Sequence, residues 1–597
     1  MTSEQKVSDR EIDVMSANLA KLEALQERMA KALAKRKPIR TDLQGPGQDL
    51  FLKAAAAWMS ETMNNPTRMV EHQVGWWGKT LSHYAEAQKR LARGDMTPPP
   101  DETPTDRRFS NPLWETHPFF NFIKQQYMMN SEAMVNVVAD TEAMDEKDRK
   151  RLDYFTRQIV DMMAPTNFLA TNPDALEQAL KTEGQSLVDG LENFVRDLEA
   201  NDGEVVVSLA DKSAFTVGEN LATTQGSVVY RNAYFELIQY APTTPKVHRT
   251  PMLIFPPWIN KYYILDMTER NSLVKWVVDQ GYTLFVVSWI NPDASFKDVT
   301  LENYVEHGFL EAIDQVKTIT GEQKINVTGY CIAGTTLSLT LAHLKRIGDK
   351  SVKSATFFTT LTDFSDTGEV GVFLDEDFLG GLEAEAAQNG VMKSLFMSRT
   401  FSYLRSRDLI YTPAIRTYMM GEAPPAFDLL YWNSDGTNLP GKLAVEYLRG
   451  LCQRNEFVTS GYRLFGAPVN IKDVDVPLCA VACETDHIAT WRASYSGVRK
   501  MGSKNKTFIL SQSGHIAGII NPPSKKKYGH YTNPDLTLAS EDWRAGADFN
   551  EGSWWPRWES WLAAKSGAMV KARTPGDSTH PVICAAPGTY VTANPKL

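Results

Sequence analysis

The feature that most restricts the fold of this chain is a series of short apolar runs that begins near residue 204 and alternates with helix-like segments. Each run has roughly 4 to 8 residues, the length of a buried strand. Parallel neighbours need a crossover between them, so strands that alternate with helices predict a mostly parallel, doubly wound α/β sheet covered on both faces. The runs are VVVSLA, SVVYRN, FELIQY, PMLIFPPW, YTLFVVSW, KINVTGY, SATFFTT, PLCAVACETD and KTFILSQSGH.

Residues 1–203 differ in composition from the strand-rich region that follows. They contain long stretches rich in Ala, Leu, Glu, Gln and Lys, which favour helix. Two of these stretches are MSANLAKLEALQERMAKALAKR and MVEHQVGWWGKTLSHYAEAQKRLARG. We therefore predict a helical N-terminal domain over 1–203 and a catalytic α/β domain over 204–597. The amphipathic stretches of the first domain could face a partner, and packing against the rest of the protein is the alternative. Between SATFFTTLTDF and VPLCAVACETD the helix-and-loop pattern predicts a cap, inserted at about 365–474 over the carboxyl edge of the sheet.

Composition narrows the class of protein. With 43% hydrophobic residues the chain is typical of a globular protein, and its net charge of −9 gives no overall reason to expect nucleic acid as a partner. The longest apolar runs, such as LFVVSWI, fall far short of the about 20 residues that a transmembrane helix needs. The five cysteines lack C-x-x-C spacing, so we expect reduced thiols in the cytosol and no metal site: Cys331, Cys452, Cys479, Cys483 and Cys584.

The stretch GYCIAGTT, at 329–336, places a cysteine where an apolar strand turns into a helix. A sharp strand-to-helix turn exposes its central side chain and needs small residues two positions before and after it. Gly329 and Ala333 occupy those positions around Cys331, although glycine is the usual residue at the second. The pattern predicts a nucleophile elbow, and a buried structural cysteine is the alternative.

An acid and a histidine follow Cys331 in the order used by α/β-hydrolases, each just after a predicted strand. Asp486 follows PLCAVAC, and His515 follows KTFIL. His487 is an alternative base, and Asp363 and Asp366 are alternative acids. The other histidines lack a position at a strand end, and His343 lies within a predicted helix: His72, His83, His117, His248, His307, His343, His530 and His580.

An acyl-transfer site also needs backbone N–H groups that bind the oxyanion. One normally comes from the residue after the nucleophile, here Ile332. The loop IFPPWINKYYILD follows an earlier strand and offers Trp258 or Ile259 as the second donor. A proline-stiffened turn without a catalytic role is the alternative for this loop.

A cysteine nucleophile favours acyl transfer over simple hydrolysis. The thiolate is the attacking species, and a histidine partner and a helix N-terminus both favour it. When a thiolate accepts an acyl group from a thioester, one thioester replaces another and the acyl group stays activated. Transfer of that group to an alcohol is then downhill.

With these residues identified, the chain resembles the class I polyhydroxyalkanoate synthases from about residue 50 onward. This resemblance implies polymerisation of (R)-3-hydroxyacyl-CoA with release of CoA, no other cofactor, and an α/β-hydrolase domain with a cap. It also implies a cytoplasmic homodimer on the surface of a polyester granule, with granule-associated proteins as further partners. The N-terminal domain over 1–203 would then serve granule or partner association and support the dimer. The motifs that carry it are GYCIAGT, FPPWINKYYILD, LLYWNSDGTNLPG, ACETDHIATW, SQSGHIAGIINPP, GSWWPRWESWL and APGTYV.

Carried onto this chain, the resemblance implies Cys331 as nucleophile, His515 as general base and Asp486 as the acid, which also assists activation of the 3-hydroxyl group. Trp432, in YWNSD, falls in a cap segment associated with the dimer or the substrate channel. Ala333 departs from the commoner glycine, which puts the elbow geometry in question. The class I similarity favours short acyl groups of about 3 to 5 carbons.

The phosphates of CoA need a basic entrance, because guanidinium groups bind phosphate through paired hydrogen bonds. The stretch MSRTFSYLRSRD offers Arg399, Arg405 and Arg407. Solvated surface charge is the alternative for each of them.

Two other functions fit parts of the sequence. A cysteine-nucleophile thioesterase or polyester hydrolase has the same fold and the same three residues. A catalytically idle granule-coating protein would need only the helical N-terminal part.

Overall fold

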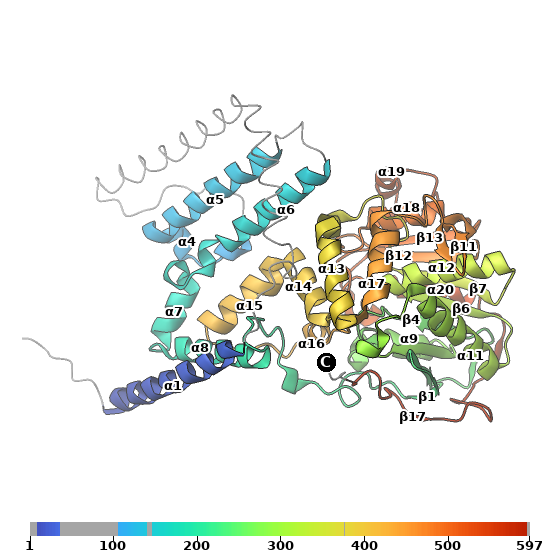
Figure 1. The fold of residues 1–597 in the computed structure, drawn as a ribbon, viewed down its shortest axis with the longest axis horizontal. Coiled ribbons are helices and arrows are strands. Elements are labelled where there is room, and N and C mark those ends of the chain that lie inside the picture. The colour runs from blue at the N-terminus through green and yellow to red at the C-terminus, as the bar shows by residue number, and fades with distance from the viewer. Residues whose placement is uncertain (1–8, 36–105, 140–145, 375, 594–597) are drawn as a thin grey trace, which may run out of the picture. The chain divides into compact units, whose positions relative to one another are not determined.

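The computed structural model describes residues 9–35, 106–139, 146–374 and 376–593 (Figure 1). Contacts divide the chain into two compact units. The N-terminal unit comprises Met1–Asp211 with Arg399–Pro425, and the sheet unit comprises Lys212–Ser398 with Ala426–Leu597. Residues 399–425, part of the predicted cap, therefore cluster with the N-terminal helices.

The described part of the N-terminal unit is helical, as the composition of this region predicts. Charged pairs join α1 to α8, among them Arg28 Nη2 to Glu199 Oε2 at 2.6 Å. Asn193 of α8 donates to the Thr417 carbonyl oxygen at 3.0 Å, which ties η12 (Ile415–Met419) to the same helix. The predicted helix MVEHQVGWWGKTLSHYAEAQKRLARG lies outside the described residues. The longer helices are α1 (Asp9–Ala34), α5 (Pro118–Ala139), α6 (Glu146–Met162), α7 (Pro173–Lys181) and α8 (Gln185–Ala200).

The sheet unit is built on an 11-stranded sheet with the order β15-β14-β13-β12-β7-β6-β4-β5-β2-β1-β17. The strands from β13 to β5 in that order are parallel, and the strands at both sides are antiparallel. This confirms the predicted sheet, and eight of the nine predicted runs form its strands. The strands are β1 (Gly226–Arg231), β2 (Phe235–Tyr240), β4 (Met252–Phe255), β5 (Leu284–Trp289), β6 (Ile325–Tyr330), β7 (Val352–Phe358), β12 (Leu478–Cys483), β13 (Lys506–Ser511), β14 (His530–Thr532), β15 (Asp548–Asn550) and β17 (Cys584–Ala585).

The prediction of a strand at VVVSLA is wrong. Residues 204–209 have no regular structure, and Val205 is 56% exposed. Ser208 donates through its backbone N–H and its hydroxyl to the Asp197 carboxylate, at 3.0 and 2.6 Å. Its hydrogen bonds are therefore made to α8 and not to a neighbouring strand, which a pattern of apolar residues alone does not reveal.

Helices that follow the parallel strands cover the sheet (Figure 1). Strands β4 and β6 are buried along their whole length, as expected when both faces are covered. The covering helices include α9 (Leu273–Asp279), α11 (Glu311–Thr320), α12 (Ile332–Ile347), α18 (Trp491–Lys500) and α20 (Trp555–Ala563). Among the described residues, none of the helices is long and apolar enough to cross a bilayer.

The tryptophans of GSWWPRWESWL join α20 to the core of the sheet. Trp554, Trp555 and Trp558 are fully buried, and each indole N–H has an acceptor. Trp554 donates to the Gly518 carbonyl oxygen at 2.8 Å and Trp555 to that of Ile519 at 2.9 Å. These two bonds fix the loop that follows β13, where the functional histidine is predicted.

The motif APGTYV closes one edge of the sheet. The carboxylate of Glu236, fully buried in β2, accepts from the backbone N–H groups of Thr589 at 2.9 Å and Tyr590 at 3.0 Å. A Cβ at Gly588 would lie 2.2 Å from this carboxylate. The glycine therefore permits the close approach that satisfies a buried charge.

Candidate functional site

Cys331 lies between β6 and α12 in a strained conformation, with φ 53° and ψ −125°. Few residues other than glycine adopt a positive φ, and such strain is typical of functional turns. The Cys331 N–H donates to the Phe358 carbonyl oxygen at 2.8 Å, and its own carbonyl accepts from Gly334 N at 2.8 Å. Cys331 is only partly buried, whereas Cys479 is completely buried. The geometry is that of a nucleophile elbow, not of a cysteine enclosed in the core.

Small residues around Cys331 let the strand and the helix approach closely. A Cβ at Gly329 would lie 2.6 Å from the Gly334 Cα atom, which no real contact permits. Ala333 is completely buried, so its methyl group is accommodated. The departure from glycine at this position is thus compatible with the elbow, and the closest backbone approach falls on Gly334.

Replacing Gly329 with alanine is expected to lower the free energy of unfolding by about 1 to 3 kcal/mol, because the added methyl group must push β6 and α12 apart. CoA-releasing activity should fall with it, because the same displacement moves Cys331. Gly380→Ala is the matched control, since nothing lies within 4 Å of a Cβ at that helical position. Chemical denaturation of both variants measures the difference, and equal stability would contradict the steric argument.

Asp486 and His515 form a buried hydrogen-bonded pair beyond the ends of β12 and β13. His515 Nδ1 lies 2.6 Å from Asp486 Oδ2. The other carboxylate oxygen, Oδ1, accepts from the backbone N–H groups of Ile488 and Ala489, both at 2.9 Å. Asp486 is therefore held rigidly and orients the imidazole through Nδ1, which leaves Nε2 for a second partner.

The second group that acts on the His515 imidazole is the Cys331 side chain. Burial alone would lower the pKa of His515. The charges of Asp486 and Cys331, and hydrogen bonds to both side chains, outweigh burial and hold this pKa well above its ordinary value. The imidazole is therefore oriented by Asp486 and placed where it can exchange a proton with the cysteine nucleophile.

The backbone N–H groups predicted as oxyanion donors make no hydrogen bonds among the described residues. Across the ranges that the structure describes, no acceptor bonds the backbone N–H of Ile332, Trp258 or Ile259. The carbonyl oxygens nearby are engaged, because Thr437 N donates to Ile259 O at 3.3 Å and Trp289 Nε1 donates to Pro256 O at 2.8 Å. A loop with bonded carbonyls and unbonded N–H groups is suited to an anion.

Two tyrosines at this site escaped the sequence analysis. Tyr330, just before the cysteine, donates to the His515 carbonyl oxygen at 3.2 Å, and the two rings lie 5.9 Å apart. Tyr447 donates to Thr335 Oγ1 at 3.2 Å and packs edge-on against Trp258. In the sequence, only the position of Tyr330 next to Cys331 could have indicated that it lies at the site. Tyr447 comes from the predicted cap, and no sequence pattern there indicates a position near the site.

The alternative residues have other partners. Asp363 accepts hydrogen bonds from Lys500, from Ser496 at 2.7 Å and from Asn455 at 2.9 Å. Burial would raise its pKa, but these bonds lower the pKa to about 2. Asp366 is exposed, and the Asp486 carboxylate faces His515 rather than the adjacent His487.

Replacing Asp363 with asparagine is expected to lower the free energy of unfolding by about 2 kcal/mol, because Lys500 and two further donors lose a buried charged acceptor. CoA release per folded molecule should stay within about fivefold of the unmodified protein. Thermal unfolding and a thiol-release assay test both parts. A loss of activity as large as that of Asp486→Asn would make Asp363 the functional acid instead.

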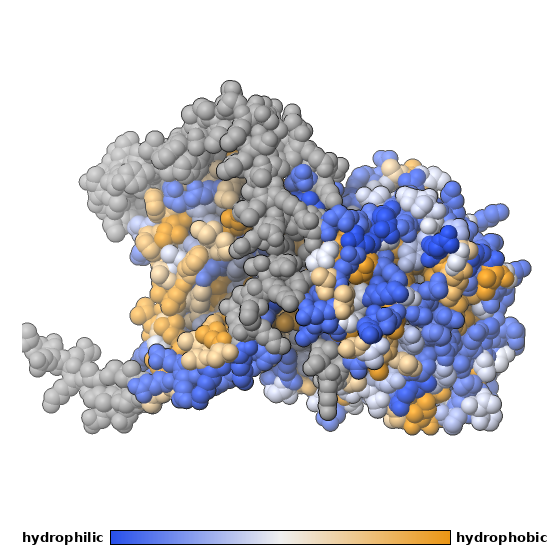
Figure 2. Space-filling view, in the orientation of Figure 1, coloured by the Kyte–Doolittle hydropathy of each residue, from blue (hydrophilic) through white to orange (hydrophobic). Residues whose placement is uncertain are grey.

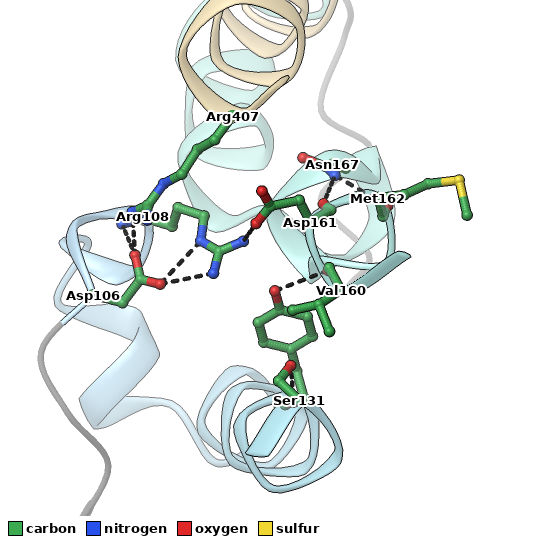
Figure 3. Close-up of polar contacts among 9 residues, drawn as sticks. Asp106, Arg108, Ser131, Val160, Asp161, Met162, Asn167 and Arg407 are labelled. Atoms are coloured by element: carbon green, nitrogen blue, oxygen red, sulfur yellow. Dashed lines mark hydrogen bonds and ion pairs between the residues drawn. The ribbon is translucent and has the colours of Figure 1, made fainter. Parts of the chain in front are cut away.

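The three arginines proposed for CoA phosphates already have carboxylate partners within the N-terminal unit. Arg399 pairs with Glu204, and Arg405 pairs with Asp408. Arg407 pairs with Asp106, which also accepts from Arg108 (Figure 3). Arg108 in turn reaches Asp161 at 3.1 Å. These contacts favour a structural role, and phosphate binding by these arginines stays a prediction.

Trp432 lies on α16 (Asp428–Ser434) and is 5% exposed. Its indole Nε1 donates to the Lys261 carbonyl oxygen at 2.8 Å, in the loop that carries Trp258 and Ile259. A tryptophan in this position braces the loop, and its predicted association with a dimer or a substrate channel stays untested.

Two models of known protein families match this chain. Residues 105–277 match the model described as the N-terminus of poly-beta-hydroxybutyrate polymerase (PhaC). Residues 264–522 match the alpha/beta hydrolase fold, which confirms the predicted fold class.

Curated relatives extend the match over most of the chain. A poly(3-hydroxyalkanoate) polymerase of Methylorubrum extorquens is 39% identical over 544 residues, covering 90% of this chain and 88% of the relative. The poly(3-hydroxyalkanoate) polymerase subunit PhaC of Cupriavidus necator is 43% identical, covering 82% and 83%. That of Rhizobium etli is 36% identical, covering 90% and 85%. By this similarity over nearly its whole length, the chain belongs to the family of poly(3-hydroxyalkanoate) polymerases.

Proposed function

We propose that this chain polymerises (R)-3-hydroxyacyl-CoA, of short chain such as 3-hydroxybutyryl-CoA, into polyhydroxyalkanoate with release of CoA. The observation that carries the proposal is the joining of Cys331, His515 and Asp486 at the ends of β6, β13 and β12, beside unbonded N–H groups. The names of the relatives supply the polymer class.

Acylation begins when His515 takes the proton of the Cys331 thiol. The thiolate attacks the thioester carbonyl, and the N–H of Ile332 with that of Trp258 or Ile259 holds the developing oxyanion. The bond from carbon to the CoA sulfur then breaks, and the leaving thiolate takes the proton from His515. The product is an acyl thioester on Cys331.

Elongation uses the 3-hydroxyl group of one acyl unit as the nucleophile. His515, oriented by Asp486, accepts the hydroxyl proton while the oxygen attacks an acyl thioester. The new carbon–oxygen bond is an ester, and the sulfur that leaves takes the proton back. Each cycle lengthens the polyester by one unit and releases one CoA.

The test is incubation of the purified protein with (R)-3-hydroxybutyryl-CoA. Free CoA together with insoluble polyester supports polymerisation, whereas CoA together with soluble 3-hydroxybutyrate identifies a thioesterase. Mass spectrometry of protein quenched during turnover should find 3-hydroxybutyryl units on the peptide that contains Cys331. Turnover without such an adduct would reject the covalent mechanism.

Association with the polyester surface through the N-terminal unit is part of the proposal. Figure 2 shows apolar surface on the helices of this unit. Met163 is 58% exposed and Leu180 is 81% exposed. Such exposed apolar side chains are typical of an interaction surface.

The assembly proposed is a cytoplasmic homodimer at the granule, with granule-associated proteins as further partners. Sedimentation of the protein with and without polymer tests both statements.

A further inference from the structure

Two segments far apart in the sequence lie side by side within the sheet unit: the loop 256–263, after β4, and the cap segment 432–437. Asn260 and Gly436 form an antiparallel bridge. Thr437 N donates to the Ile259 carbonyl oxygen at 3.3 Å. Together with the bond from the Trp432 indole to Lys261 O, these contacts fix the backbone of the loop that carries the unbonded N–H groups of Trp258 and Ile259.

A buried lysine, Lys261, and a partly buried aspartate, Asp435, lie within the same junction. Lys261 is 3% exposed, and its ammonium Nζ has no hydrogen-bond acceptor among the described residues. Asp435 is the opposite charge that acts on it, although the two do not form an ion pair within 4 Å. Tyr263, from the loop side, donates to Asp435 Oδ2 at 2.8 Å.

Each of these two charges depends on the other. Burial lowers the pKa of Lys261, and Asp435 opposes this change. Burial likewise raises the pKa of Asp435, and Lys261 and the Tyr263 hydroxyl oppose that change. An ammonium and a carboxylate in such a place are stable only while the loop and the cap segment stay together, because separation leaves a buried charge uncompensated.

We propose that Asp435 and Lys261 are positioning residues for the oxyanion-binding loop. Asp435 acts from the cap, through Tyr263 and Lys261, to hold the N–H groups of Trp258 and Ile259 in the orientation that acyl transfer requires. The inference rests on the proposed function and extends it, because it makes cap placement a condition for transition-state binding. A displacement of about 1 Å at such a site lowers the rate by about 10²-fold.

The test separates the oxyanion loop from the nucleophile. Asp435→Asn keeps the shape of the side chain and removes its charge. It is expected to lower kcat for CoA release by about 10- to 100-fold, with KM within about twofold. Alkylation of Cys331 by iodoacetamide needs no oxyanion donor, so its rate should stay within about twofold. The matched control is Asp428→Asn on the same helix, where Asp428 bonds Asn271, and it should leave both rates unchanged.

Two more variants make the result decisive. Tyr263→Phe removes the hydrogen bond to Asp435 and keeps both charges, and we expect it to lower kcat by about tenfold. This variant therefore provides the test if Asp435→Asn does not fold. The double variant Lys261→Met with Asp435→Asn should be no slower than the slower single variant, because both changes break one interaction. Additive losses would overturn the inference.

The remaining outcomes are equally distinct. Unchanged CoA release in Asp435→Asn and Tyr263→Phe would overturn the inference and leave the proposed function intact. An equal fall in alkylation and CoA release would show a general disturbance of the site and would also overturn it. Failure of the proposed function shows itself differently, as CoA release that survives replacement of Cys331.

Discussion

Replacing Cys331 with alanine is expected to abolish CoA release from (R)-3-hydroxybutyryl-CoA, with a fall of at least about 10⁴-fold. The methyl group that remains cannot form a thioester, and water attacking from the same place would lack the elbow's orientation. A thiol-specific colorimetric assay measures the rate, and mass spectrometry should find no acyl adduct on the variant protein.

The matched control for this prediction is Cys584→Ala. Cys584 is a partly buried cysteine on β17, where its sulfur lies 3.8 Å from Arg231 Nη2. Its replacement should leave CoA release within about twofold. CoA release that persists in Cys331→Ala would show that the chemistry lies elsewhere in the protein. A catalytically idle granule-coating protein would release no CoA even before the replacement.

Replacing His515 with glutamine is expected to lower CoA release by about 10³- to 10⁴-fold, because no other group takes the proton of the thiol or of the attacking hydroxyl. The raised pKa of His515 means that the unmodified protein holds a proton on the imidazole up to higher pH than a free histidine does. In the variant, iodoacetamide alkylation should become fast only above about pH 8, where an isolated thiol ionises.

His343→Gln is the control for the histidine experiment. His343 bonds Arg346 at 2.9 Å and packs against Phe465 at 4.6 Å, in the helix that begins after Cys331. Its replacement should change neither CoA release nor the pH dependence of alkylation. If His515→Gln leaves the alkylation profile unchanged, the imidazole does not control the thiol, and the proposed mechanism fails at its first step.

Local patterns predicted the sheet because each parallel strand carries its own signal. INVTGY and MLIF bury every residue, so apolar runs and strand positions coincide. The error at VVVSLA has the same origin, since the partner that stops strand formation, Asp197, comes from a helix whose position no local pattern contains. Short edge strands such as β15 and β17 escaped prediction, because they depend on their neighbours for hydrogen bonds.

The order of residues along the chain predicted Cys331, Asp486 and His515 as candidates, because each follows a strong strand signal. The structure brings them together, while the catalytic role of each stays a proposal. Lys261 and Asp435 carry no comparable signal, since their meeting depends on how the cap folds back over the loop after β4. Long-range contacts of that kind arise from tertiary packing rather than from periodicity.

The long connection between β7 and β12 has a consequence for folding. These neighbours pair in parallel, with Ala355 opposite Leu478, and the residues between them include 399–425, which cluster with the N-terminal helices. Closing so long a loop is entropically unfavourable, and until it closes one side of β7 is an unpaired strand edge. Refolding from denaturant should therefore be slow and prone to aggregation, and chaperone assistance during synthesis should raise the yield of native enzyme.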